Sequence, residues 1–144
     1  MHKKRIILRK NLPVSAFFCI FAADFIIKLA GNGIYIRHTV CHMKALLADY
    51  YALKQLTFDD ILDFHVRFER IHPFQDGNGR VGRLLLFWQC LQNAHVPFII
   101  SEELRLFYYR GLQNWGNTNA YLSDTCLTAQ DHYKALLDYF KVKY

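Results

Sequence analysis

The chain has 144 residues, of which 53% are apolar and 21% are charged, with 12 Phe and 9 Tyr. This composition excludes a disordered or collagen-like chain, and the length predicts one domain with one core. The formal net charge is +6, but five basic residues precede the first acidic residue, Asp24, and the rest of the chain is nearly neutral. A nucleic-acid groove needs basic residues spread along one face, so we do not expect a nucleic-acid partner.

The N-terminal stretch resembles an export signal only in part. A basic run precedes the apolar stretch Val14–Ala23, as in a signal peptide, but large residues, Ile20 or Phe21, lie three residues back from either candidate cleavage site. Asp24 and Lys28 interrupt the apolar run before it reaches the length of a membrane span, about 20 residues. We therefore predict a core helix here and expect neither export nor membrane insertion.

The four cysteines predict neither a disulfide framework nor a zinc ribbon. They lie far apart and form no Cys-x-x-Cys pair, which favours a reducing, cytoplasmic location. His38, Cys41 and His42 are grouped, and the two histidines would share a face if this stretch were helical. Because zinc sites normally use three or four protein ligands, we do not expect a metal site here.

Periodicity predicts helices joined by short loops in the rest of the chain. Gly31–Gly33 is a break, Ile34–Ile36 is interpreted as a short strand or extended loop, and Met43–Leu53 has helical spacing. Thr57 and Asp60 form a capping-box pattern, which predicts the start of the next helix. Its apolar residues recur at helical spacing: Ile61, Phe64, Phe68 and Ile71. A strand through Phe64, Val66 and Phe68 is the less favoured alternative.

Three further helices are predicted towards the C-terminus. Val81–Asn93 contains the unbroken apolar run Leu84–Trp88, which is typical of a centrally buried helix. Ser101 is predicted to cap the next helix, with the two following glutamates in its first turn. Asp124 is predicted to cap the last helix. The apolar residues of that helix are Leu127, Leu136, Leu137 and Phe140.

Chemistry-bearing residues concentrate in His72–Arg83, HPFQDGNGRVGR, a glycine-rich turn between two predicted helices. Its Gly-x-Gly-x-x-Gly spacing matches the dinucleotide fingerprint, but that fingerprint requires a preceding strand. A Walker loop is excluded because Gly-Lys-Ser/Thr is absent. A calcium loop is excluded because its first and last positions would be Phe74 and Leu85, which cannot bind calcium.

The glycine turn predicts a phosphate-binding cradle. Gly77 and Gly79 allow the backbone to approach a ligand closely, and the amides that enter the helix near Arg80 are unpaired donors at the positive end of the helix dipole. Arg80 and Arg83 are one helical turn apart, so both can reach the same polyphosphate.

Two side chains beside the cradle indicate what it does. A carboxylate at Asp76, next to phosphate oxygens, implies a bridging divalent cation, and Mg²⁺ is commonly held by one carboxylate plus phosphates. Histidine is the side chain best suited to accept a proton at neutral pH, so His72 is the candidate for taking the proton of an attacking hydroxyl. Phe74 is expected to anchor the loop in the core.

The same segment resembles a known family signature. HPFQDGNGRVGR matches HPFx(D/E)GNGRxxR of the Fic (fido) family at every specified position, and Met43–Phe140 is similar to the bacterial Fic helical core. The resemblance implies an all-α Fic-fold bundle, with a central helix-loop-helix that carries the active-site loop and Gly33–Thr39 as the candidate remnant of a short β flap. It also implies a protein adenylyltransferase, which transfers AMP from ATP to a Ser, Thr or Tyr hydroxyl of a target protein and releases pyrophosphate.

Residue roles follow from the resemblance, position by position. It implies that His72 is the catalytic base, that Asp76 binds Mg²⁺, and that Arg80 and Arg83 clamp the phosphates of ATP. The other loop positions that it assigns to nucleotide binding are Gly77, Asn78, Gly79, Val81 and Gly82. Tyr108 and Tyr109 match a tyrosine pair of the nucleotide pocket, with a purely structural, buried aromatic pair as the alternative.

The chain departs from the family pattern in two respects. Residues 1–42 match poorly and are interpreted as a divergent or truncated N-terminal segment, with residues 43–144 as the Fic core. None of Glu69, Glu102 and Glu103 precedes Gly or Asn, as the inhibitory (S/T)xxxE(G/N) motif requires. Constitutive self-modification is therefore expected, unless a separate protein supplies the inhibitory glutamate in trans. Two alternatives stay open: a non-catalytic remnant or interaction module that binds nucleotide, and an enzyme that transfers another phosphate-linked group.

Overall fold

The computed structural model describes residues 33–144, with side chains from residue 38 onward. This part of the chain forms five α-helices and no strand: α2 (Gly33–Ala52), α3 (Phe58–Ile71), α4 (Asn78–Gln92), α5 (Arg105–Asn114) and α6 (Ala120–Tyr139). The all-α prediction is confirmed. The expected strand or flap at Gly33–Thr39 is wrong, because α2 already begins at Gly33. The predicted helix around Val14–Ala23 lies outside the described residues.

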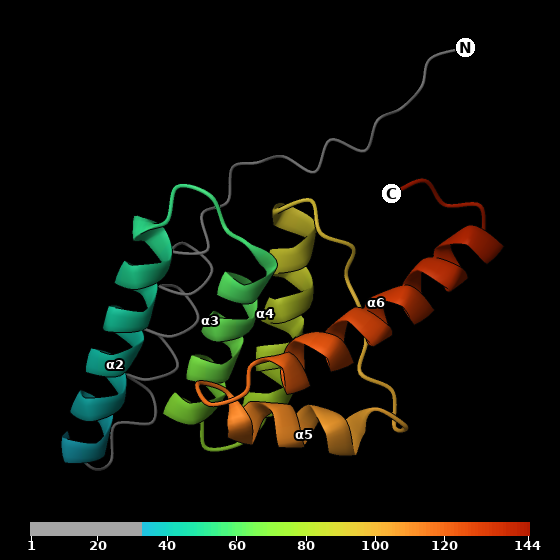
Figure 1. The fold of residues 1–144 in the computed structure, drawn as a ribbon. Helices are drawn as coiled ribbons and strands as arrows, with labels where there is room; N and C mark the ends of the chain where they lie inside the picture. The colour runs from blue at the N-terminus through green and yellow to red at the C-terminus, as the bar shows by residue number, and fades with distance from the viewer. Residues whose placement is uncertain (1–32) are drawn as a thin grey trace.

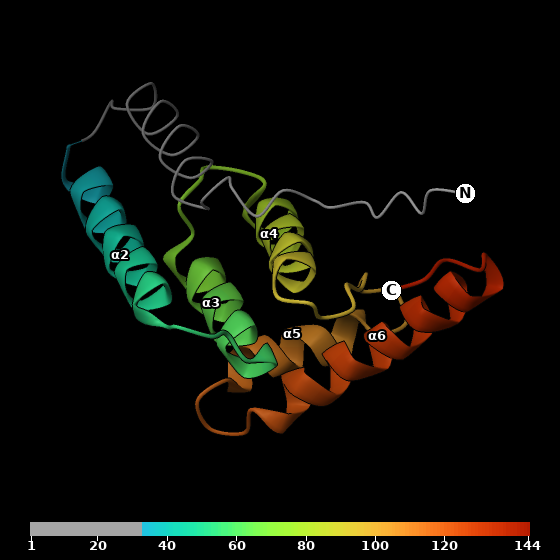
Figure 2. The same ribbon diagram turned by 90° about the horizontal axis from the view of Figure 1, so that it is seen from above.

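The helices form two packed groups (Figures 1 and 2). In Figure 1, α2, α3 and α4 stand side by side, and the α5–α6 pair crosses them. The C-terminal part of α6 extends past the other helices in both views. Two ties hold the α5–α6 loop to α3: the Trp115 indole donates to Asp63 over 2.9 Å, and Arg70 donates to the Trp115 carbonyl over 2.8 Å.

The predicted capping box starts α3. Thr57 Oγ1 accepts a hydrogen bond from the Asp60 amide at 3.2 Å, and the Asp60 carboxylate accepts one from the Thr57 amide at 2.8 Å. Two of the unpaired donors at the helix start are satisfied in this way. Ile61, Phe64 and Phe68 are all buried, as the helical spacing predicted, so the alternative strand is wrong.

The central helix is α3, because its opposite faces enter two different hydrophobic clusters. One face contributes Ile61, Leu62 and Val66 to a cluster with α4, α5 and α6. The other contributes Phe64 and Phe68 to a cluster with α2. We call this second cluster the α2–α3 cluster; its α2 residues are Met43, Leu46 and Tyr50.

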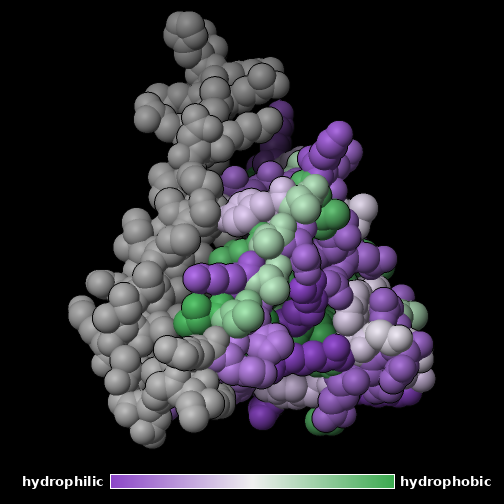
Figure 3. All heavy atoms as spheres, turned by 90° about the vertical axis from the view of Figure 1, so that its left-hand side faces the viewer, coloured by the Kyte–Doolittle hydropathy of each residue, from purple (hydrophilic) through white to green (hydrophobic). Residues whose placement is uncertain are grey.

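The prediction that the run Leu84–Trp88 lies on a centrally buried helix is confirmed in part. Leu86 is buried, but Leu84 is 67% exposed, and Trp88 is half-buried. The helix enters both hydrophobic clusters, with Leu86 and Cys90 in the first and Leu85 and Trp88 packed against the second. Figure 3 shows the face of the molecule on the α2 side, where hydrophilic side chains surround narrow hydrophobic patches.

The predicted starts of the last two helices are also wrong. Ser101 lies in a turn four residues before α5, and its hydroxyl has no hydrogen-bond partner among the described residues. Asp124 lies inside α6, which begins after Asn119. The Asn119 side chain instead accepts from the Gly116 amide at 2.7 Å and so fixes the α5–α6 loop. Of the predicted apolar residues of α6, Leu127, Leu136 and Phe140 are exposed.

Candidate functional site

The loop between α3 and α4 is closed by an internal clasp. The Phe74 amide donates to Asn78 Oδ1 at 2.8 Å, and Asn78 Nδ2 donates back to the Phe74 carbonyl at 2.6 Å. Asn78 is buried, and the Phe74 side chain packs on the α2–α3 cluster with its ring 6.2 Å from that of Phe68. The predicted anchoring role of Phe74 is confirmed, and the loop is held before any ligand binds.

Glycine is required where the loop enters α4. Gly77 precedes the helix with a φ of 80°, a left-handed conformation that side chains disfavour, and no side chain caps the helix there. The first amides of α4 are therefore available to an anion, at the positive end of the helix dipole.

Both arginines lie over this entry point. The Arg80 guanidinium is 3.5 Å from the position that a Cβ would occupy at Gly77, and the Arg83 guanidinium is 3.1 Å from the corresponding position at Gly79. Two guanidinium groups and the start of a helix thus converge on the same glycine turn. This arrangement forms a positively charged cradle for a phosphate or polyphosphate.

Asp76 lies at the edge of the cradle. One carboxylate oxygen accepts from the Gly77 amide at 2.6 Å, and the other is 3.1 Å from Arg80 Nη2. The Asp76 side chain is 91% exposed, so its oxygens remain open to a cation that also binds phosphate. One carboxylate beside a phosphate cradle fits Mg²⁺, which takes few protein ligands and keeps several waters. No group of three or more His, Cys, Asp or Glu suited to a metal occurs among residues 38–144.

His72 ends α3 next to the cradle. Its backbone is left-handed, with a φ of 52°, and its amide donates to the Phe68 carbonyl at 3.1 Å. Its Nδ1 lies 3.4 Å from the Glu69 carbonyl, which can only accept a hydrogen bond. The proton of a neutral imidazole is therefore held on Nδ1, which leaves Nε2 as the acceptor on an exposed side chain.

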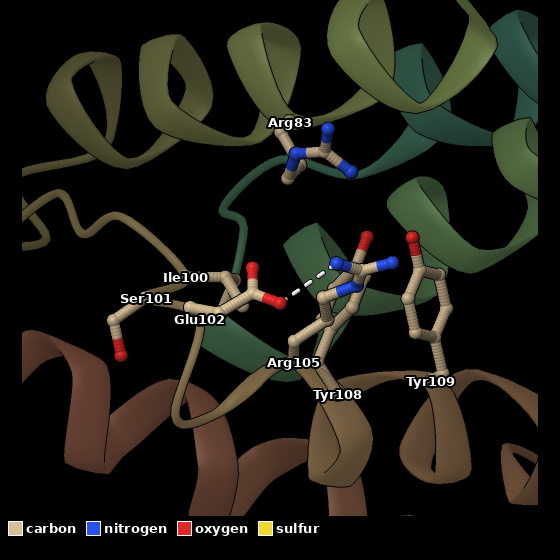
Figure 4. A pocket seen from close by; sticks show the side chains of 7 residues that line it. All are labelled: Arg83, Ile100, Ser101, Glu102, Arg105, Tyr108 and Tyr109. Atoms are coloured by element: carbon tan, nitrogen blue, oxygen red, sulfur yellow. Dashed lines mark hydrogen bonds and ion pairs between the residues drawn. The ribbon is translucent and has the colours of Figure 1, made fainter.

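A pocket of about 240 Å³ opens on the α5 side of the second arginine (Figure 4). Its lining residues are Arg83, Ile100, Ser101, Glu102, Arg105, Tyr108 and Tyr109. Tyr108 is buried, whereas Tyr109 is 45% exposed, so the alternative of a buried aromatic pair is wrong for Tyr109. Figure 4 shows both hydroxyls on the side of Arg83.

Sequence reasoning did not place two charged residues of this pocket, Glu102 and Arg105, at the site. Arg105 donates to the Glu102 carboxylate at 2.7 Å inside it, and the i, i+3 spacing of this pair was the available signal. It also missed two buried groups behind the loop, His65 and Glu69. Burial raises the pKa of the Glu69 carboxyl, against the charges of Arg83 and His72, which lower it. Burial lowers the pKa of His65 to about 4.

The structure therefore brings together the predicted loop residues from His72 to Arg83, and α5 adds Tyr108 and Tyr109 beside the second arginine. Val81 is half-buried against the α2–α3 cluster, and Gly82 faces His65 and Glu69 instead of the cradle. His38 and His42 share a face of α2, as expected for a helix, with their Nε2 atoms 3.1 Å apart.

The described part of the chain is thus an all-α protein with a glycine-rich helix-loop-helix on which two arginines converge. No helix within residues 33–144 is both long enough and apolar enough to cross a membrane. Comparison with known families matches residues 34–90 to the Fic/DOC family. The matched residues include the whole helix-loop-helix from α3 to α4.

Among curated proteins, the chain is similar to the proteins named "Protein adenylyltransferase Fic" of Aedes aegypti and Culex quinquefasciatus, each 43% identical over 49 residues. The protein of the same name from Drosophila melanogaster is 41% identical over 49 residues. The match covers 34% of this chain and 10% of each relative. The chain therefore matches about a tenth of the length of these relatives.

Proposed function

We propose that this protein is a protein adenylyltransferase, which transfers AMP from ATP to a Ser, Thr or Tyr hydroxyl of a target protein. The observation that carries the proposal is the convergence of Arg80 and Arg83 on Gly77–Gly79, beside an exposed His72. The match of residues 34–90 to the Fic/DOC family and the names of the insect relatives support it.

ATP binding in this proposal uses the cradle and the adjoining pocket. The first amides of α4 and the two guanidiniums take the phosphates, with the backbone of Gly77–Gly79 in close approach. Asn78 contributes to ATP binding indirectly, because it holds the loop closed. Val81 and Gly82 contribute by packing the start of α4 against its neighbours. The pocket beside Arg83 receives the nucleoside, with Tyr108 and Tyr109 in its wall.

Asp76 would hold Mg²⁺ at the edge of the cradle together with phosphate oxygens. When bound, the cation supplies positive charge that stabilises the phosphate oxygens and the departing pyrophosphate.

His72 supplies the base. Its Nε2, free because Nδ1 faces the Glu69 carbonyl, accepts the proton of the target hydroxyl. The hydroxyl oxygen forms a bond to the α-phosphorus of ATP, and the bond from that phosphorus to the bridging oxygen breaks. The products are an AMP-modified side chain and pyrophosphate, whose negative charge lies against Arg80 and Arg83.

Parallel incubations with α-labelled and γ-labelled ATP test the proposal. Protein-bound label from the α position alone is the expected result. Label from the γ position alone indicates phosphorylation instead, and no label from either, with ATP binding intact, indicates a non-catalytic remnant.

The catalytic assignment is tested with His72→Ala. We expect transfer to be abolished and ATP affinity to stay nearly unchanged, because the imidazole acts in the transition state and not on the bound phosphates. His132→Ala, an exposed histidine on α6, is the matched control. Wild-type transfer rates in His72→Ala would remove His72 from the mechanism.

A further inference from the structure

A buried histidine joins three helices directly behind the cradle. His65 on α3 is 1% exposed; its Nδ1 lies 3.1 Å from the carbonyl of Gly82 on α4, and its Nε2 lies 2.6 Å from the hydroxyl of Tyr108 on α5. It does not line the pocket beside Arg83. Its ring therefore connects the helix that carries the arginines with the helix that carries the tyrosines.

The partners of His65 determine where its proton lies. A carbonyl can only accept a hydrogen bond, so Nδ1 must carry the proton and donate to Gly82. The ring is neutral, because burial keeps its pKa far below neutral pH. Nε2 is then an acceptor, and the Tyr108 hydroxyl must donate its proton to it.

This orientation leaves the lone pairs of the Tyr108 oxygen available to a donor, and Arg83 lies beside it in the pocket. Figure 4 shows the Tyr108 hydroxyl on the side of Arg83. Burial and the Glu69 carboxylate raise the pKa of the Tyr108 hydroxyl, while the positive charge of Arg83 lowers it. Arg83 also lies over Gly79, at the cradle. Arg83 thus shares a pocket with the Tyr108 hydroxyl and also reaches the glycine turn that is the proposed phosphate site.

Glu69 is the remaining neighbour of the His65 ring. Its Oε1 is buried without a hydrogen-bond partner, lies 4.0 Å from His65 Nε2, and occupies the space that a side chain at Gly82 would need. The absence of a Cβ at Gly82 lets α4 approach α3 closely enough for the His65 bond.

We propose that His65 is a positioning residue for the second arginine: through Tyr108 it presents a fixed acceptor that holds the Arg83 guanidinium in place for the terminal phosphates of ATP. This positioning role rests on the proposed function in one respect, the identification of ATP as the ligand. His65 itself touches neither substrate nor reacting atoms.

A double-mutant cycle on ATP binding tests the proposal. His65→Leu is expected to weaken ATP binding about fivefold to tenfold, which is within the usual effect of losing one intramolecular hydrogen bond. In an Arg83→Ala background, the same substitution should cause no further loss, because the guanidinium that it positions is gone. Tyr108→Phe should weaken binding in the wild-type background, and Tyr50→Phe, at a buried tyrosine of the α2–α3 cluster, is the control.

Equal loss of affinity in both backgrounds, or no loss in either, overturns the proposal. So does a long-range ¹H–¹⁵N spectrum of the wild-type protein that places the proton of His65 on Nε2 at pH 7. The spectrum needs neither nucleotide nor activity, so it decides the matter even if His65→Leu does not fold. Non-additive ATP binding without AMP transfer supports the positioning role and refutes the proposed function, so the two failures are distinguishable.

Discussion

Acid should destabilise this fold through His65. The side chain is fully buried, and burial lowers its pKa from the ordinary 6.5 to about 4, with the Gly82 carbonyl opposing this shift and the Arg83 charge adding to it. In the unfolded chain the imidazole takes up a proton near pH 6.5, but in the folded chain it does so only near pH 4. Between these values the unfolded state holds more protons, so stability falls as the pH falls.

The size of the effect follows from the two pKa values. Relative to neutral pH, the contribution of His65 lowers the free energy of unfolding by about 2 kcal/mol at pH 5 and approaches about 3 kcal/mol below pH 4. Glu69 acts in the opposite direction, because burial raises the pKa of its carboxyl and the folded state then binds a proton more readily. The pH dependence of the free energy of unfolding is therefore more informative as a difference between the wild type and a His65 variant than in the wild type alone.

Urea denaturation at pH 7.5, 6.0 and 5.0 measures this difference. Between the highest and lowest pH, the wild type should lose about 2 kcal/mol more than His65→Leu, which cannot bind a proton at this position. His132→Leu, an exposed histidine on α6, should keep the wild-type pH profile. Parallel profiles for the wild type and His65→Leu would show that His65 is not buried as a neutral ring, and would refute the reasoning.

Three further substitutions test local features. Thr57→Ala should lower the free energy of unfolding by about 1 kcal/mol because the capping box is lost, and Thr57→Ser should restore it. Gly111→Ala places a Cβ 2.7 Å from the Leu122 Cα, and the overpacking cost of about 1–3 kcal/mol should exceed the gain in helix propensity. The midpoint of thermal denaturation should therefore fall, whereas Gln113→Ala, at an exposed position of the same helix, should leave it unchanged. Asp76→Ala should remove the Mg²⁺ dependence of ATP binding, and identical magnesium titrations would contradict the metal assignment.

The sequence predicts the loop and α3 well because their signals are local. The capping box identifies the start of α3, and the spacing of Ile61, Phe64 and Phe68 identifies its buried faces. The loop residues from His72 to Arg83 are contiguous, so their proximity requires no knowledge of the fold. Even the internal clasp of Asn78 spans only four residues.

The parts that could not be predicted depend on contacts between distant segments. Ser101 and Asp124 are both good capping residues, yet α5 and α6 start elsewhere, because the close approach of Gly111 to Leu122 and the tie at Asn119 fix this pair. The role of His65 is hidden in the sequence for the same reason. Its partners lie 17 and 43 residues further along the chain, and only the packing of α3 against α4 and α5 reveals them.

The clasp between Asn78 and Phe74 has a consequence for how this site is controlled. The Asn78 side chain binds both the amide and the carbonyl of Phe74 and so closes the loop, which leaves little chain entropy to be lost when a ligand arrives. A regulator therefore gains little by ordering or disordering this loop. Control would have to act on the charges around the cradle, above all the exposed Arg80 and the half-buried Arg83, by neutralising them.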